Sequence, residues 1–484
     1  MQRTAIQRIL GLFLMLFSIT MLPPVAVSQW YGDNTSAPFI AGFALTLITG
    51  LLFWLPVRRS RSELRLRDGF VIVVMFWSVL ALFGALPLLL TDRPQLSFTD
   101  ALFESMSGLT TTGATVIAGL EHLPKAILYY RQQLQWLGGM GIIVLAVAVM
   151  PILGIGGMQL YRAETPGPMK DNKLTPRITE TAKALWYIYL TLTVSCALAY
   201  WAAGMTLFDA IAHSFSTVSI GGFSTHDLSM GHFNDQPLIE VIAIIFMFLA
   251  AVNFSLHFLA WRSVGIKPYL ADTEFKVYSY ILLGACTITV AYLYWVGTFN
   301  SLDETLLRGI FQAVSIGTTT GFTTSEYHYW PGFLPMMLLM MSFIGGCAGS
   351  TGGGMKVIRV VMLFKQGARE MLRLVHPSAQ IPIKIGRKAV PDRVIEAVWG
   401  FFSLYVICFC IMGLLLVATG LDFVTAFSAV AACMNNLGPG LGDVGANYTS
   451  VNDVAKWILC FAMLLGRLEI FTLLILLTPA FWRK

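Results

Sequence analysis

Long apolar blocks run through this chain, and they limit what it can fold into. Each is about 20 residues long, the length that an α-helix needs to cross a hydrocarbon core of roughly 30 Å. A soluble helix of that length would carry a polar face, and these blocks carry none. Only 12% of the residues are charged, about half the share usual in soluble globular proteins. The pattern predicts an all-α integral membrane protein.

We predict ten membrane spans, of which the first two form an extra N-terminal pair. The expected ranges are 6–22, 38–56, 70–90, 132–155, 184–204, 237–260, 276–296, 331–363, 396–420 and 454–480. The first block resembles the apolar part of a signal peptide. No small-residue cleavage site follows it, so we expect a retained helix.

Positive charge predicts the orientation of these spans. An even number of spans puts both termini on one face, together with the loops at 57–69, 156–183, 261–275 and 364–395. Most of the 32 lysines and arginines lie in these segments, so this face is expected to be cytoplasmic. The opposite loops hold most of the acidic residues. That acidity would concentrate cations there, or would simply solvate the loops.

Four short segments lie between alternate spans and repeat one pattern. Each is a run of small and apolar residues that passes through Thr, Ser or Asn and ends at a glycine; the segments are 98–113, 207–222, 306–321 and 423–438. A near-constant spacing of the same units indicates four copies of one structure. We therefore expect four M1–pore loop–M2 repeats in a pseudo-fourfold arrangement, where M1 and M2 are the first and second spans of a repeat. The expected boundaries are 1–67 for the N-terminal pair and 68–180, 181–270, 271–390 and 391–484 for the repeats.

The physics of this unit favours a cation pore. A short helix that ends inside the membrane directs the negative end of its dipole toward the membrane centre. Irregular backbone is tolerated at that depth only where it lines a water-filled cavity or is buried in protein. Four such segments around an axis would present rings of carbonyl oxygens that replace the water shell of an ion. Tight helix packing through small residues is the alternative, and it accounts poorly for four segments in register.

The same segments resemble a known family. Residues 109–113 (LTTTG), 219–223 (SIGGF), 317–322 (GTTTGF) and 435–440 (NNLGPG) are similar to the four filters of the Trk/Ktr/HKT superfamily of potassium transporters, and 135–141 (QWLGGMG) resembles the start of a pore-lining helix in its TrkH branch. The similarity covers 68–480. It implies that K⁺ is held by the backbone carbonyls of Thr110, Thr111, Thr112, Gly113, Ser219, Ile220, Gly221, Gly222, Thr318, Thr319, Thr320, Gly321, Asn435, Asn436, Leu437 and Gly438. In plant relatives a serine in the first filter accompanies sodium transport, so Gly113 favours potassium. The fourth filter departs from the threonine–glycine pattern.

The resemblance also implies partners. It predicts a homodimer with one pore per subunit, embedded in the lipid bilayer of a bacterial inner membrane, and a cytoplasmic regulatory subunit of the TrkA type that binds NAD(H) or ATP/ADP. The basic segments 57–69 and 356–393 would suit docking of that subunit, although the orientation rule alone explains them. No organic cofactor is expected in this chain beyond the transported K⁺, and no nucleic acid partner is expected.

A glycine-rich segment interrupts the eighth span. No helix survives the glycine density of 345–354 (GGCAGSTGGG), because each interior glycine costs up to about 1 kcal/mol relative to alanine. We expect this break just below the third filter, where family members carry an intramembrane gate. The gate residues would be Gly345, Gly346, Gly349, Gly352, Gly353 and Gly354. The spacing before Lys356 does not match a phosphate-binding loop.

Arg467 is expected near the middle of the last span. An arginine facing lipid there would cost at least about 2.5–3.5 kcal/mol, so it should face the pore or a partner. TrkH relatives carry an arginine at this place, beneath the filter. We predict that Arg467 belongs to the gate, raises the barrier to cations and hydrogen-bonds carbonyls of the glycine loop. A packing role through an ion pair with Glu469 is the alternative.

These features predict a gated, channel-like pathway for potassium uptake. An ion-coupled secondary transporter, with K⁺/H⁺ or K⁺/Na⁺ symport through the same filter, remains the alternative. A transporter built from two halves with broken helices fits four short units poorly. An enzyme would need paired acids, an activated nucleophile or metal ligands at membrane depth, and none is apparent in the sequence.

Overall fold

The computed structural model describes residues 2–59, 66–141, 178–386 and 388–483. Helices make up nearly all of the regular structure in these ranges, and one small hairpin pairs β1 (Lys384–Ile385) with β2 (Lys388–Ala389). Among the described residues, six helices are long and apolar enough to cross a membrane, or up to eight if two bent pairs each count as one span. The predicted class, an all-α multi-pass membrane protein, is confirmed.

The N-terminal pair consists of α1 (Arg3–Ile19), continued by α2 (Leu22–Tyr31), and α3 (Ser36–Trp54). α1 and α3 cross with their backbones in close approach. A Cβ added at Gly11 would lie 2.8 Å from the Gly50 carbonyl oxygen, and one at Gly50 would lie 2.9 Å from the Gly11 oxygen. Any side chain at either position would therefore push the two helices apart.

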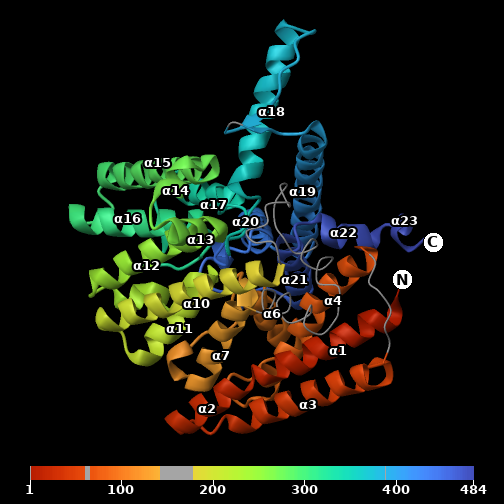
Figure 1. The fold of residues 1–484 in the computed structure, drawn as a ribbon. Helices are drawn as coiled ribbons and strands as arrows, with labels where there is room; N and C mark the ends of the chain where they lie inside the picture. The colour runs from red at the N-terminus through yellow and green to blue at the C-terminus, as the bar shows by residue number, and fades with distance from the viewer. Residues whose placement is uncertain (1, 60–65, 142–177, 387, 484) are drawn as a thin grey trace.

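Each predicted repeat contains an M1 helix, a short pore helix and an M2 helix (Figure 1). The M1 helices are α4 (Leu66–Gly84, followed by α5, Leu86–Leu90), α10 (Ile178–Ala202), α15 (Thr273–Val296) and α19 (Asp392–Ala418). The pore helices are α6 (Phe98–Leu109), α11 (Leu207–Ser219), α16 (Leu302–Gly317) and α20 (Phe423–Met434). The M2 segments are α7 (Lys125–Trp136), α12 with α13 and α14 (Pro237–Ala250, Phe254–Ser263, Lys267–Ala271), α17 with α18 (Leu334–Ile344, Val357–Val375), and α21 with α22 and α23 (Asp453–Arg467, Phe471–Leu477, Pro479–Trp482).

Short turns of helix complete the chain. 3₁₀ turns occupy Leu55–Val57, Leu120–His122, Ser229–Phe233, Tyr327–Tyr329 and Gly442–Val444. A π-helical turn at Leu137–Gly141 follows α7. The rest of the predicted span 132–155, and the loop 156–183 as far as residue 177, lie outside the described residues.

The pore helices begin at polar caps. The side chains of Ser97, Thr206, Ser301 and Asp422 accept hydrogen bonds from backbone N–H groups in the first turns of α6, α11, α16 and α20. Such caps satisfy amide groups that a helix start leaves without partners.

Two predicted spans, 237–260 and 454–480, are wrong as continuous helices. The first bends by 95° between α12 and α13, and the second by 118° between α21 and α22. Asn253 caps α13 by accepting a hydrogen bond from the Ser255 N–H at 2.8 Å. At the second bend, Glu469 and Ile470 take the left-handed φ values of 52° and 57°. Hydropathy measures how apolar a segment is and carries no information about such breaks.

Both ends of the described chain lie beside the start of α4. The Gln2 N–H donates to Asp68 at 3.1 Å, and Arg67 donates to the Arg483 carbonyl at 3.0 Å. α18 points away from the helical body (Figure 1).

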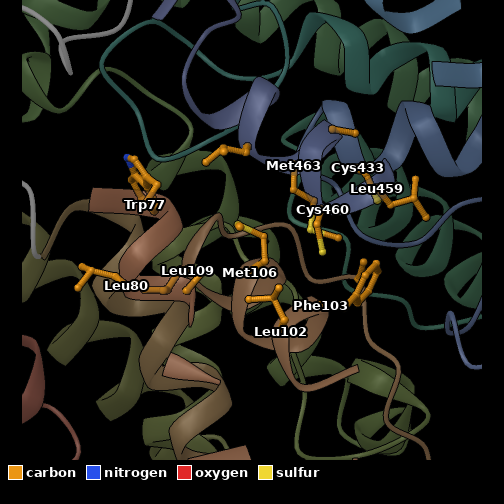
Figure 2. Packing of buried hydrophobic residues seen from close by; sticks show 14 of the residues in the cluster. Trp77, Leu80, Leu102, Phe103, Met106, Leu109, Cys433, Leu459, Cys460 and Met463 are labelled. Carbon is orange, nitrogen blue, oxygen red and sulfur yellow. The ribbon is translucent and has the colours of Figure 1, made fainter. Parts of the chain in front are cut away.

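Apolar packing fastens repeat four onto repeat one. Figure 2 shows Met463 and Leu459 of α21 near Met106 and Phe103 of α6, with Trp77 of α4 farther to the left, above Leu80. These residues belong to one buried cluster. The packing holds the first pore helix between M2 of repeat four and its own M1 helix.

Candidate ion filter and gate

The same turn ends every pore helix. The turn consists of the four predicted filter residues of each repeat (110–113, 219–222, 318–321 and 435–438). In each copy the third of these residues donates its N–H to the carbonyl five positions earlier. The bonds are Thr112 to Ser107 (2.9 Å), Gly221 to Ser216, Thr320 to Ser315 and Leu437 to Ala432 (each 2.8 Å). A shared hydrogen-bond pattern shows that the four segments adopt one local structure although their side chains differ.

Left-handed backbone recurs at two positions of this turn. The second residue has a positive φ in every copy, with 55° at Thr111, 56° at Ile220, 68° at Thr319 and 53° at Asn436. The closing glycines have φ values of 81° (Gly113), 80° (Gly222), 82° (Gly321) and 95° (Gly438). A left-handed conformation costs a non-glycine residue roughly 1–2 kcal/mol. Strain repeated at four equivalent places is characteristic of functional sites.

The four turns meet in a closed ring. A Cβ added at Gly113 would lie 2.2 Å from the Gly221 carbonyl oxygen, and one at Gly222 would lie 2.1 Å from that of Thr320. A Cβ at Gly321 would lie 2.0 Å from the Leu437 oxygen, and one at Gly438 would lie 2.7 Å from the Thr112 oxygen. The filters therefore touch in the order one, two, three, four and back to one, which is the pseudo-fourfold order that the sequence predicts. No side chain fits at any of the four contacts.

Side-chain hydrogen bonds stiffen filters one and three in the same way. The hydroxyls of Thr110 and Thr112 lie 2.8 Å apart, and so do those of Thr318 and Thr320. Each pair connects the first and third residues of its turn. These bonds explain a threonine pattern that the sequence shows in these two filters.

The asparagines of filter four serve a related purpose. Asn435 Nδ2 donates to the Ser342 hydroxyl at 2.9 Å, and the Tyr405 hydroxyl donates to Asn435 Oδ1. Asn436 Nδ2 donates to the Thr112 hydroxyl and to the Met463 carbonyl, both at 3.0 Å. Asn436 thus joins filter four directly to filter one. The asparagine that replaces a threonine in this filter supplies the hydrogen bond between the last and the first filter.

The glycine-rich segment forms a non-helical loop between α17 and α18. Gly353 N–H donates to the Thr319 hydroxyl at 2.7 Å, and Gly354 N–H donates to the Asn435 carbonyl at 3.1 Å. Thr351 donates to the Val218 carbonyl at 3.0 Å, at the end of the second pore helix. The loop therefore contacts filters three and four and the end of the second pore helix, a wider reach than the predicted position below filter three.

The bend in M2 of repeat two provides the docking site for this loop. Cys347 N–H donates to the Ala251 carbonyl at 2.9 Å, and Phe254 N–H donates to the Gly349 carbonyl at 3.0 Å. A broken helix leaves backbone groups without internal partners, and these groups bind the loop. The bend and the glycine loop thus satisfy each other's hydrogen bonds.

Two further side chains hold the loop, and sequence reasoning missed both. Glu274 of α15 accepts hydrogen bonds from the Ala348 and Ile358 N–H groups at 2.7 and 3.1 Å. The buried ammonium of Lys356 donates to the Gly352 carbonyl. A charged residue beside an apolar block was the available signal for each of them.

Arg467 lies beneath the first filter. Its guanidinium donates to the Gly138 and Gly139 carbonyls, the latter at 2.8 Å, and to the Thr111 hydroxyl at 3.3 Å. It also lies 5.2 Å from the centre of the Trp77 ring. These acceptors belong to repeat one, whereas we predicted carbonyls of the glycine loop. The loop and Arg467 together contact filters one, three and four and the end of the second pore helix.

Glu469, the alternative partner that we predicted for Arg467, forms an ion pair with Arg359 of α18. That pair connects the bend after α21 to the helix that leaves the glycine loop. Arg359 also stacks over the Phe401 ring at 4.3 Å. The bend and the gate segment are therefore mechanically connected.

Comparison with known proteins agrees with this geometry. Residues 35–484 match the family model described as TrkH, cation transport protein. The chain is 59% identical to the Trk system potassium uptake protein TrkH of Vibrio parahaemolyticus over the full length of both chains, and 55% identical to that of Escherichia coli K12 over 99% of each. The crystal structure of the potassium transporter TrkH from Vibrio parahaemolyticus covers all of both chains with a TM-score of 0.91 at 56% identity. The chain belongs to the TrkH family of cation transport proteins.

Proposed function

We propose that this protein takes up potassium ions through the ring of four filters. The main support for the proposal is the ring of contacts between the filters, which runs through Gly113, Gly222, Gly321 and Gly438. The ring brings four strained, non-helical segments together at the ends of four helix dipoles. Carbonyl rings of this kind replace the hydration shell of a cation. The printed names of the relatives, potassium uptake proteins, supply the ion.

The glycine loop and Arg467 would act as the gate. The loop binds filters three and four and the end of the second pore helix, and the positive guanidinium of Arg467 lies at filter one. A cation leaving the filters would meet both the loop backbone and two positive side chains, Arg467 and Lys356. Displacement of the loop would open the pathway.

The direct test is rubidium uptake into liposomes that hold the purified protein and trapped potassium. We expect uptake driven by the trapped gradient alone, abolished by external potassium and unaffected by equal external sodium. A requirement for an added proton or sodium gradient would favour ion-coupled symport instead. A silent wild-type protein that leaks once the loop is shortened would be a shut pore; silence in both, with folded protein, would contradict the pore.

The assembly is also part of the proposal. Homodimerisation, a TrkA-type cytoplasmic subunit that binds NAD(H) or ATP/ADP, and cytoplasmic termini follow from the family resemblance and from the distribution of Lys and Arg. Mass measurement of the purified protein in lipid nanodiscs tests the dimer. Flux measured with the added subunit and each nucleotide tests the regulation, and protease cleavage at an engineered terminal site in inverted vesicles tests the topology.

A further inference from the structure

We propose that Gln135 of α7 sets the geometry of the second filter and thereby contributes to ion selectivity. This inference rests on the function proposed above. Gln135 belongs to repeat one, so it would act on the filter of its neighbour. It is a positioning residue, because its side chain binds the filter backbone and leaves the ion to the carbonyls.

Both ends of the Gln135 amide bind backbone around Gly222. Its Nε2 donates to the Gly221 carbonyl at 2.6 Å, and its Oε1 accepts the Phe223 N–H at 3.1 Å. One turn earlier on the same helix face, Gln132 Nε2 donates to the Phe223 carbonyl at 3.1 Å. Both glutamines are fully buried. A single helix thus binds the backbone on both sides of Gly222, at Gly221 and at Phe223.

The second filter lacks side-chain hydrogen bonds of the kind that stiffen the other three. Filters one and three carry threonine pairs, and filter four carries two asparagines. In filter two, Ile220 is apolar, Gly221 and Gly222 have no side chains, and the Ser219 hydroxyl donates back to the Ser216 carbonyl of its own pore helix at 3.3 Å. Two successive glycines have the greatest backbone freedom of any pair. The hydrogen bonds from Gln135 of repeat one restrain this backbone in place of side chains of its own.

Equivalent positions elsewhere are apolar. At the same distance after the filter glycine, the other repeats carry Ile244, Phe343 and Cys460 in place of Gln135. They carry Val241, Met340 and Trp457 in place of Gln132. A buried amide costs free energy unless its hydrogen bonds are satisfied, so packing alone would favour an apolar residue here too. The polar exceptions occur on the M2 helix whose side chains bind the backbone of the second filter.

The braced carbonyl lies at a boundary between filters. A Cβ at Gly221 would lie 2.4 Å from the Gln135 side chain, so the amide packs directly on the filter backbone. The Gly221 oxygen is the same atom that closely approaches Gly113 of filter one. A shift of this carbonyl would therefore change the spacing of two filters. Coordination of K⁺ over Na⁺ depends on the spacing and number of carbonyl ligands.

The test compares two glutamines of one helix. Gln135→Leu removes the bonds to Gly221 and Phe223. Gln133→Leu is the matched control, because Gln133 is also buried and donates to a backbone carbonyl, that of Thr20 at 2.8 Å, away from the filters. We expect the ratio of K⁺ to Na⁺ flux to fall roughly five- to tenfold in Gln135→Leu, which corresponds to about 1–1.4 kcal/mol of discrimination between the two ions. Gln133→Leu should keep the wild-type ratio.

Each outcome decides the inference. A lower ratio in Gln135→Leu alone supports it. An unchanged ratio in Gln135→Leu, or an equal fall in both variants, overturns it and leaves potassium uptake standing. If Gln135→Leu does not fold, Gln135→Glu keeps the shape and the acceptor for Phe223 and loses the donor to Gly221, and an unchanged ratio in that variant overturns the inference equally. If neither the wild-type protein nor the variant with a shortened loop passes K⁺, both proposals are overturned.

Discussion

Glu240 of α12 and Arg308 of α16 form a buried ion pair across the boundary between repeats two and three. Lys456 and Asp100 form the equivalent pair between repeats four and one, 2.6 Å apart, at the same distances from their own filter glycines. The charges are exchanged: M2 carries the acid at one boundary and the base at the other. The order of the filter ring places these two boundaries opposite each other. Each pair fastens a pore helix to the M2 helix of the preceding repeat.

Glu240→Leu should lower the thermal stability of the protein. Removing one member of a buried pair leaves the other charge without compensation, at a cost of about 3–5 kcal/mol. The double variant Glu240→Leu/Arg308→Leu should regain much of the loss, because neither charge then remains buried. Thermal unfolding in detergent, followed by tryptophan fluorescence, measures both. A double variant as unstable as the worse single one would show that the pair acts through other contacts.

Arg467→Ala should raise flux through folded protein several-fold. The substitution removes a positive charge from the path and the hydrogen bonds to Gly139 and Thr111. Arg467→Lys keeps the charge and should remain closer to wild type. Rubidium uptake at matched protein density is the measurement. Unchanged flux in Arg467→Ala would exclude this residue from the gate.

Thr351→Val should loosen the glycine loop. The hydroxyl donates to the Val218 and Ala250 carbonyls at 3.0 and 3.2 Å, and valine keeps the shape without the donor. Loss of about 1 kcal/mol from the closed arrangement would raise open occupancy by about fivefold. Single-channel recording or tracer flux tests this, with Thr351→Ser as the control that keeps the hydroxyl. Equal behaviour of the valine and serine variants would contradict the role of these bonds.

Gly113→Ser should damage selectivity more than expression. The residue has a φ of 81°, and a new Cβ would approach the Gly221 oxygen to 2.2 Å, so backbone must move at the contact of filters one and two. We expect the K⁺ to Na⁺ flux ratio to fall about tenfold or more, since a 1.4 kcal/mol change corresponds to tenfold. Gly119→Ser is the control, because a Cβ at Gly119 meets nothing within 4 Å although its φ is also positive. An unaltered ratio in Gly113→Ser would mean that this ring contact does not determine selectivity.

Acid should destabilise the loop that follows filter two. His226 and His232 stack with ring centres 3.6 Å apart, and the facing acids are Asp209 and Glu121, at 3.6 and 3.9 Å from His226. Burial and the charge of His226 lower the pKa of His232 from 6.5, although Asp209 and Glu121 oppose the shift. His232 therefore binds a proton more weakly in the folded state than in the unfolded chain. The contribution of neutral His232 to folding stability is present above pH 6.5 and is lost as the pH falls through the lowered pKa. His232→Gln should flatten the dependence of the melting temperature on pH between about 5 and 7, and an unchanged slope would assign the effect to other groups.

The sequence by itself determined the membrane class, the repeated short helices, the closing glycines and the break before α18. Each of these depends on a local property: a block long enough to span, a glycine where φ is positive, or a glycine density that no helix tolerates. Such properties act within a few residues, so they can be read in order along the chain. The same reasoning placed Arg467 among residues that need polar partners.

The tertiary structure decided which groups meet. The bends after Ala250 and Arg467, the acceptors of Arg467 in repeat one, the ion pairs between repeats and the Gln135 brace all join segments distant in sequence. Asn436 and Thr112, for example, are 324 residues apart and share a hydrogen bond. A buried polar side chain must find a partner, but local pattern cannot say which one, because that choice depends on how the four repeats close into a ring.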